Sequence, residues 1–243
     1  ETAQRLGIQT VPSLGILHSS LDVEKDLKGQ HFPVIIKPVS GSSGSAIRVA
    51  RDRREAQERI AALLTREEIA HQGVLVEPFL ANARHIEIPF LRDSQGNLVL
   101  FPEIESTIQR RFQKILQESP AIVLSDSQRR SMQGDLQRLV SELNYQGLGS
   151  VEFLLHEERP LLLELNSSLQ INHIIASWHW GHSLLEQQIR IAMGELLPRQ
   201  GTTVVSPRHH LVLCALMAES PENNFQPSSG GSHAGRPTPH PMT

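Results

Sequence analysis

The sequence has one cysteine, no long apolar run and no cluster of basic residues. Because Cys214 stands alone, an internal disulfide is excluded, which fits a reducing cytosol. The formal net charge is -3 without a basic run, which argues against nucleic acid or an anionic membrane as partner. No apolar stretch reaches the roughly 18 residues of a membrane span, and no signal peptide precedes Glu1. These absences predict a cytoplasmic protein that binds neither nucleic acid nor membrane.

A complete set of zinc ligands is also missing. Of the 12 histidines, His179 and His182 have a plausible ligand spacing, but no cysteine or further histidine completes the set. We therefore expect no structural zinc site. The 243 residues allow one large domain or two modest ones, and the helical pattern at residues 1–6 indicates a fragment of a longer protein.

Three polar side chains interrupt a predicted β-hairpin. Its apolar strands, residues 151–155 and 160–165, are joined by a short charged turn. Glu152 breaks the first strand, whereas Glu164 and Asn166 share one face of the second because side chains alternate along a strand. Converging carboxylate and amide oxygens predict a Mg²⁺ site that holds a nucleotide's phosphates. The alternative is a solvated hairpin edge, and this stretch alone does not decide between them.

A candidate phosphate loop follows the predicted strand at residues 33–37. Lys37 ends the strand, and residues 39–46 form a serine- and glycine-rich loop that includes Gly41 and Gly44. Small residues let backbone N–H groups turn toward phosphate, and Lys37 adds a positive charge beside them. The same residue types also make ordinary tight turns, so the loop alone is a weak signal.

The predicted strand at residues 73–80 ends in a carboxylate. Glu77 is placed to accept a hydrogen bond from the exocyclic amine of adenine, while the N–H of Leu80 donates to the ring. Glutamate is common at strand ends, so an ordinary surface position is the alternative. Pro78 stiffens the chain as a hinge between domains would require.

Two further segments carry polar side chains near these strands. Residues 84–91 alternate cleanly, so His85 and Glu87 share a polar face that belongs either to solvent or to a nucleotide cleft. Residues 103–120 have no sustained apolar stripe and form either a solvated face or a loop near a triphosphate. The polar residues of interest in that segment are Gln109, Arg110, Arg111 and Lys114.

Capping patterns place the helices. Asp52 with Glu55, Ser125 with Gln128, and Ser183 with Glu186 each predict a helix start. We expect Gly147 and Gly149 to end the second of these helices, a last strand at residues 209–218, and a disordered tail at residues 228–243.

In order and spacing, these motifs resemble the ATP-grasp portion of biotin carboxylase, a component of acetyl-CoA, propionyl-CoA and pyruvate carboxylases. About nine segments within residues 1–230 carry the resemblance, including RHIE at 84–87, QRR at 109–111, VEF at 151–153 and ELN at 164–166. It implies an α+β ATP-grasp fold with a small α/β lid subdomain over an antiparallel-sheet body. The implied boundaries are a helix end and connector at 1–16, the lid at 17–78, the body at 79–227 and a tail at 228–243.

The resemblance also implies ATP and Mg²⁺ as cofactors, with Mn²⁺ as a substitute metal, and gives roles to individual residues. Residues that would contact the phosphates, the ribose or the adenine are Lys37, Gly41, Gly44, Glu77, Leu80, His85 and Gln109. Residues at the metal would be Glu152, Glu164 and Asn166. Lys114 and Gln170 would lie in the bicarbonate site and take part in catalysis.

Departures from the family pattern fall mostly on the carboxylation residues. Ser168 replaces the arginine expected to hold bicarbonate, and Asn172 replaces the glutamate expected to act as base. Ala215 stands where the family has an arginine thought to steady the biotin enolate, and Phe112 replaces a histidine on the nucleotide side. The nucleotide and metal residues are mostly kept.

Three functions are consistent with these residues. The first is an ATP-dependent carbon–nitrogen ligase that converts bicarbonate or another small acid into an acyl phosphate and transfers it to a nitrogen such as that of biotin. The second is a catalytically silent ATP-binding module in a larger assembly. The third is an ATP-grasp ligase with a different acceptor. A biotin carrier domain and a second copy of the full-length protein are the expected protein partners.

Overall fold

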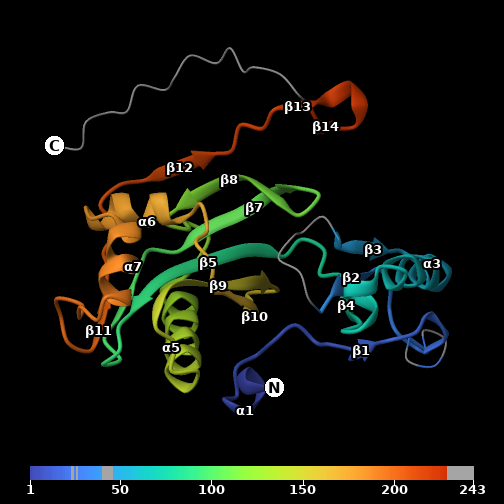
Figure 1. Ribbon diagram of the computed structural model, residues 1–243, viewed down its shortest axis with the longest axis horizontal. Coiled ribbons are helices and arrows are strands. Elements are labelled where there is room, and N and C mark those ends of the chain that lie inside the picture. The colour runs from blue at the N-terminus through green and yellow to red at the C-terminus, as the bar shows by residue number, and fades with distance from the viewer. Residues whose placement is uncertain (23–24, 26, 40–45, 229–243) are drawn as a thin grey trace.

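The computed structural model describes residues 1–22, 25, 27–39 and 46–228, and its strands fall mainly into two sheets (Figure 1). The small sheet is antiparallel and has the order β1 (Ile16–Leu17), β4 (Val74–Pro78), β2 (Val34–Pro38) and β3 (Arg48–Ala50). The main path of the large sheet runs β10 (Arg159–Asn166), β9 (Gly147–His156), β5 (Arg84–Arg92), β7 (Ile104–Arg110), β8 (Gln113–Ser119) and β12 (Leu211–Cys214). Beside that path, β6 (Leu98–Leu100) pairs with β5, and β11 (Thr202–Val204) pairs with β6 in parallel.

The remaining elements are short or lie outside the two sheets. The helices are α1 (Thr2–Arg5), η1 (Ser20–Asp22), α3 (Arg53–Leu64), α4 (Glu67–Ala70), α5 (Asp126–Glu142), α6 (His173–Trp180), α7 (Leu184–Ala192) and η3 (Pro221–Asn223). A two-stranded hairpin near the C-terminus pairs β13 (Glu219–Ser220) with β14 (Gln226–Pro227). No helix among the described residues is both long and apolar enough to cross a membrane.

Each of the three predicted helix starts is confirmed. The Asp52 side chain accepts a hydrogen bond from the Glu55 N–H, and the Ser183 side chain accepts one from Glu186. The start of α5 is a capping box with two hydrogen bonds. The Ser125 side chain accepts from the Gln128 N–H, and the Gln128 side chain accepts from the Ser125 N–H. These bonds satisfy N–H groups that lack partners within the first helical turn.

Strand β5 separates an apolar core from a polar face. Its side chains Ile86, Ile88 and Phe90 are fully buried and pack, together with residues of β9, against the apolar stripe of α5. That stripe consists of Met132, Leu136, Leu139 and Val140. Figure 1 shows α5 along one face of the large sheet. Since side chains alternate along a strand, His85 and Glu87 project from the opposite face, as the sequence predicts.

The expectation for residues 103–120 was incomplete. They form the β7–β8 hairpin of the large sheet and not an irregular loop, and they are exposed near the turn, as at Ile108 and Gln113, but buried at the other end. The apolar period is absent because the hairpin buries polar side chains, and the side-chain oxygen of one of them, Gln117, has no hydrogen-bond partner among the described residues. Gln117 and Ser119 are almost completely buried, and Ser119 bonds to the carbonyl of Glu103 and to His179.

Glycines 147 and 149 were also misassigned, because they begin β9 and do not end α5. The α5 helix ends at the Leu143 cap. A Cβ atom at Gly149 would lie 2.6 Å from the Phe90 ring. The absence of a side chain there lets the neighbouring strand place Phe90 in the core. The predicted tail lies outside the described residues except for Ser228.

Candidate functional site

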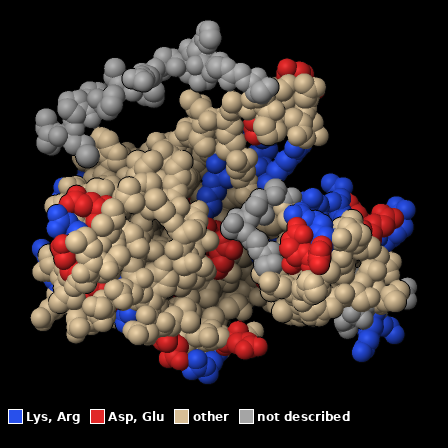
Figure 2. Space-filling model, viewed as in Figure 1, with Lys and Arg blue, Asp and Glu red and all other residues tan. Residues whose placement is uncertain are grey.

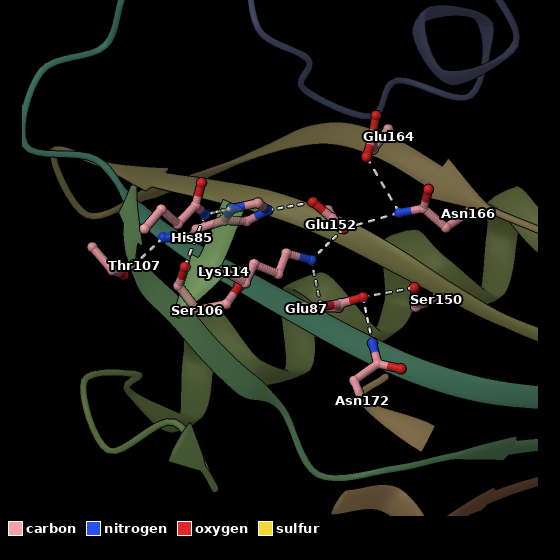
Figure 3. Close-up of polar contacts among 11 residues, drawn as sticks. His85, Glu87, Ser106, Thr107, Lys114, Ser150, Glu152, Glu164, Asn166 and Asn172 are labelled. Carbon is pink, nitrogen blue, oxygen red and sulfur yellow. Dashed lines mark hydrogen bonds and ion pairs between the residues drawn. The ribbon is translucent and has the colours of Figure 1, made fainter. Parts of the chain in front are cut away.

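Glu152 is the centre of a polar cluster on the face of the large sheet opposite α5 (Figure 3). Its carboxylate accepts hydrogen bonds from the Lys114 ammonium at 2.6 Å and from the Asn166 side-chain amide at 2.9 Å. The Nε2 atom of His85 contacts its second oxygen. These partners come from β5, β8 and β10, so the cluster forms only when four strands of the sheet are assembled.

Glu87 lies beside Glu152 and is completely buried. The Lys114 ammonium is 2.8 Å from one of its oxygens, and the Ser150 hydroxyl donates to the other at 2.8 Å. The side-chain amide of Asn172 donates to that second oxygen. A buried carboxylate is costly without partners, and three donors compensate this one.

The imidazole of His85 is fixed at both nitrogens. The Gln109 amide nitrogen is 2.5 Å from Nδ1 of His85, and it also donates to the Ser106 carbonyl at 2.8 Å. An amide nitrogen can only donate, so in the neutral imidazole Nδ1 is the acceptor and Nε2 carries the hydrogen that faces Glu152, and in the protonated imidazole Nε2 still donates to Glu152. The backbone N–H of His85 donates to the Thr107 hydroxyl at 3.0 Å.

Burial and charge act differently on the three central groups. Burial raises the pKa of Glu87, the negative Glu152 raises it further, and Lys114 opposes both. Burial also raises the pKa of Glu152, but the hydrogen bond and charge of His85 and the Lys114 ammonium outweigh this and lower it to about 2. Burial lowers the pKa of Lys114, but the two carboxylates reverse this and raise it above its ordinary value. Lys114 is therefore positive at neutral pH.

The three side chains predicted at the metal lie together. Glu164 is the register partner of Glu152 across the β9–β10 pair, and the Asn166 amide nitrogen is 3.3 Å from Glu164 and 2.9 Å from Glu152. No group of three or more His, Cys, Asp or Glu suited to a metal occurs among the described residues. Two carboxylates and an amide nevertheless fit Mg²⁺, which takes few protein ligands and shares its coordination with phosphates and water.

The predicted nucleotide residues of the small sheet lie on β2, on β4 and in the connector that follows. The Lys37 ammonium is 2.5 Å from Oε2 of Glu77, which is largely buried on the neighbouring strand. Leu80 lies between β4 and β5, where its carbonyl accepts from the Ala83 N–H. Gly41 and Gly44 lie outside the described residues.

Gln170, predicted in the acid site, is held by its own loop. Its side-chain amide nitrogen donates to the Ser168 hydroxyl at 2.9 Å, and its backbone carbonyl is 2.8 Å from Nδ1 of His173. The Ala215 N–H donates to the Ile115 carbonyl beside β8. Phe112 lies in the β7–β8 turn.

Three members of the cluster were not predicted from the sequence to contribute to it: Glu87, Ser150 and Asn172. Alternation placed Glu87 on the right face without deciding whether that face meets solvent or a cleft. Its complete burial favours the cleft. A charged residue within a strand whose other face is entirely apolar was the signal that could have identified it.

A family model for the carbamoyl-phosphate synthase L chain ATP-binding domain matches residues 1–200. The chloroplastic biotin carboxylase of Arabidopsis thaliana is 35% identical over 234 residues, which cover 95% of this chain and 43% of the relative. Biotin carboxylase 1 of Bacillus subtilis is 35% identical over 239 residues, which cover 95% and 52%. The mitochondrial methylcrotonoyl-CoA carboxylase subunit alpha of Rattus norvegicus is 33% identical over 202 residues, which cover 82% and 28%. The chain thus spans about half or less of the relatives it matches.

Solved structures agree with this assignment. The biotin carboxylase domain of Hydrogenobacter thermophilus 2-oxoglutarate carboxylase has a TM-score of 0.83 and 28% identity, with 93% of this chain and 51% of that chain covered. Campylobacter jejuni biotin carboxylase has a TM-score of 0.82 with the same identity and coverage. The predicted α+β ATP-grasp fold is confirmed, and the chain belongs to the biotin carboxylase ATP-grasp family, that of the carbamoyl-phosphate synthase L chain ATP-binding domain.

Proposed function

We propose that this chain binds Mg-ATP and activates bicarbonate or another small acid as an acyl phosphate for transfer to a nitrogen acceptor. The observation that carries the proposal is the charge of the polar cluster. Three carboxylates, those of Glu87, Glu152 and Glu164, lie with one ammonium, that of Lys114. This excess of negative charge, presented by oxygen atoms, favours a divalent cation and the phosphates it carries.

The complexes of two relatives support the same ligands. The Hydrogenobacter domain was solved with MgADP, ADP and bicarbonate, and the Campylobacter enzyme with β-γ-ATP. A homodimer of the full-length protein is a further proposal, supported by the domain dimer of the Hydrogenobacter protein. A cytoplasmic location stays a prediction, because the named relatives include a chloroplastic and a mitochondrial protein.

Each residue would contribute positioning or charge. The ammonium of Lys37 would bind the α and β phosphates, and Glu77 with the Leu80 N–H would bind adenine. Glu152, Glu164 and Asn166 would hold Mg²⁺, which supplies charge neutralisation to the phosphate oxygens when bound. Lys114, held by two carboxylates, would orient the acid and stabilise negative charge as the phosphoryl group is transferred.

Residues 168, 172 and 215 favour a second possibility, a catalytically silent ATP-binding module. The Asn172 side-chain amide donates a hydrogen bond to Glu87, and an amide does not accept a proton at neutral pH. Neither Ser168 nor Ala215 carries a charge for an anion. A third possibility is a ligase in which these smaller or neutral side chains shape the pocket for a different acceptor.

Calorimetric titration of the Glu164→Gln protein with Mg-ATP tests the metal assignment. Glu164 is exposed, so its substitution should leave the unfolding free energy within about 0.5 kcal/mol of wild type. We expect at least a tenfold loss of affinity for Mg-ATP, about 1.4 kcal/mol, and little change for ATP without metal. Glu157→Gln, an exposed carboxylate in the turn of the same hairpin, is the matched control. Wild-type affinity in a folded Glu164→Gln protein would end the metal assignment.

Phosphate release by the full-length protein then separates the three functions. Release that requires both bicarbonate and biotin supports carboxylation. ATP binding without release under any tested acid supports the silent module. Release that depends on another acid or amine supports a ligase with a different acceptor.

A further inference from the structure

Helix α6 contacts the large sheet through a polar side chain at each of its ends. At its start, the Asn172 side-chain amide donates to the buried carboxylate of Glu87 on β5 (Figure 3). Near its other end, Nε2 of His179 lies 3.0 Å from the hydroxyl of Ser119 on β8. His179 and Ser119 are completely buried. Because one short helix carries both contacts, a change at His179 acts on the residue that touches the polar cluster.

The hydrogen bonds of His179 require a neutral imidazole. The backbone N–H of Arg208 lies 3.4 Å from Nδ1 and can only donate, so Nδ1 is the acceptor. In the neutral ring, Nε2 then carries the hydrogen and donates it to the Ser119 hydroxyl. That hydroxyl in turn donates to the backbone carbonyl of Glu103 at 3.0 Å. Donors and acceptors match along the whole chain of three hydrogen bonds, which is what buried polar groups need.

Protonation of His179 removes this match. A hydrogen on Nδ1 would face the N–H of Arg208, so two donors would meet and one hydrogen bond would be lost. The positive charge would also be buried, which is costly when no opposite charge lies beside it. Burial therefore lowers the pKa of His179, and the neighbouring His209 lowers it further.

The charged groups around His179 are either basic or paired with other residues. The segment before β12 brings Arg208 and His209 to the imidazole, and both are basic. The acidic residues on the side of the sheet have other partners, in the pairs Glu103–Arg129 and Glu118–His210. A protonated His179 would therefore lack a counter-ion among the described residues.

Helix α6 adds no opposite charge of its own. Residues 165–185 contain no Asp, Glu, Lys or Arg, and the other titratable groups of this stretch are His173 and His182. In Figure 2 the surface at the upper left, where Figure 1 places α6 and β12, is formed mainly by residues other than Lys, Arg, Asp and Glu. A protonated His179 is thus more stable in water than in this environment.

We propose that His179 is a positioning residue: its neutral imidazole holds α6 on β8 and so keeps Asn172 on Glu87, and its protonation in mildly acidic solution releases the helix. The folded state binds this proton less readily than the unfolded state, whose ordinary value is 6.5. The docking of α6 is therefore fully stable above pH 6.5 and weakens as pH falls through the lowered pKa of His179. The proposal rests on this helix and does not depend on the function proposed above.

Tryptophan fluorescence of the full chain provides the first test. The two tryptophans of the chain, Trp178 and Trp180, both lie on α6, and Trp180 packs against Phe101 with 5.5 Å between the ring centroids. We expect acrylamide to quench their emission more strongly as pH falls from about 8 to about 5, in a one-proton transition about two pH units wide. Most carboxylates stay ionised over this range, so acid unfolding does not contribute.

The ring of His182 contacts Trp180 at 5.1 Å, so its own protonation would alter the fluorescence. The comparisons therefore use a His182→Gln background, which changes an exposed side chain. In this background His179→Gln should abolish the transition, because glutamine keeps a donor for Ser119 and does not titrate. A transition that persists unchanged in His179→Gln would overturn the proposal.

The exposed residue His209 gives a second variant that leaves the buried hydrogen bonds in place. His209→Gln should move the transition to higher pH, because the positive charge of His209 no longer opposes protonation of His179. This test stays decisive if His179→Gln does not fold. An unmoved midpoint in His209→Gln would contradict the assignment of the transition to His179.

The side-chain amide of Asn172 tests whether the effect reaches the other end of α6. Its NMR signal in the full chain, labelled with isotopic asparagine, is identified by its absence in Asn172→Gln. We expect the signal to move toward that of a free amide over the same pH range as the fluorescence transition, and to stay in place in His179→Gln. A fluorescence transition without a change at Asn172 would overturn the coupling. A change at Asn172 that persists in His179→Gln would assign it to titration of Glu87 and also overturn the proposal.

Discussion

The side-chain amide of Asn172 donates a hydrogen bond to the carboxylate of Glu87, 85 positions earlier in the chain. Both side chains are buried, and the contact ties the middle of β5 to the residue that precedes α6. Glu87 therefore has amide, hydroxyl and ammonium donors, and its acidic neighbour is Glu152, which raises its pKa. At this position an amide stabilises the carboxylate, whereas a second carboxylate would repel it.

Asn172→Glu should therefore destabilise the protein in a pH-dependent way. Two buried carboxylates in contact share a raised pKa, so the folded state binds more protons than the unfolded state. Stability is then present at low pH and is lost as pH rises through the raised pKa. We expect a loss of about 1 to 3 kcal/mol at pH 8 relative to wild type, and a smaller loss at pH 5, measured by urea unfolding. Asn172→Gln, which keeps the amide, is the control. An equal loss at both pH values would show that shape and not charge is responsible.

Glu152 should produce the opposite pH dependence. Its pKa in the folded protein is about 2 against an ordinary value of 4.5, so the unfolded state binds the proton more readily. The stabilisation is present above pH 4.5 and is lost as pH falls toward 2. In wild type this group should contribute about 3 kcal/mol to the acid-induced loss. The Glu152→Gln protein should be less stable at pH 7 and lose stability less steeply between pH 4.5 and 3. Parallel pH profiles for the two proteins would contradict the assignment.

The sequence predicts those parts of the site that lie on regular strands. Glu152, Glu164 and Asn166 interrupt apolar strands, and strand geometry alone places the last two on one face. Alternation likewise orients His85 and Glu87. Figure 3 therefore agrees most directly with the predictions that rest on residue spacing within one strand.

The parts that the sequence did not predict depend on long-range partners. Lys114 reaches Glu87 and Glu152, which are 27 and 38 positions away, so no local window shows that its strand is buried in the sheet. The same reason hides the β7–β8 hairpin, in which Lys114 and Ser119 have partners that are distant in the sequence. Strand β11 is too short, at three residues, for an alternation pattern to identify it.

Lys37→Ala should weaken binding of free ATP and of Mg-ATP alike. The Lys37 ammonium contacts Glu77 in the structure and would contact the phosphates, neither of which requires metal. Loss of a charge-assisted hydrogen bond should cost about 1.5 to 3 kcal/mol, or roughly tenfold to a hundredfold in affinity. Lys37→Arg, which keeps the positive charge, is the control for the fold. Calorimetry that shows unchanged affinity for metal-free ATP in Lys37→Ala would remove this residue from the nucleotide site.

The carboxylation residues can be tested together by restoring them in the full-length protein. In wild type, the Ser168 side chain is hydrogen-bonded to Gln170 and the Asn172 side chain to Glu87, and the Ala215 N–H donates to the Ile115 carbonyl. The side chains of Ser168, Asn172 and Ala215 supply neither a base nor a positive charge. We expect wild type to bind ATP and to carboxylate free biotin hardly at all. Loss of a general base typically costs about 10² to 10⁴ in rate, and loss of a charge-assisted contact to bicarbonate about 1.5 to 3 kcal/mol.

The triple variant Ser168→Arg, Asn172→Glu and Ala215→Arg should therefore increase biotin-dependent ADP formation with bicarbonate. The double variant Ser168→Arg, Ala215→Arg isolates the base, because it restores the cations and keeps the amide at position 172. Robust carboxylation by wild type would indicate a base elsewhere in the site. No gain in the triple variant despite intact ATP binding would indicate a pocket shaped for an acceptor other than biotin.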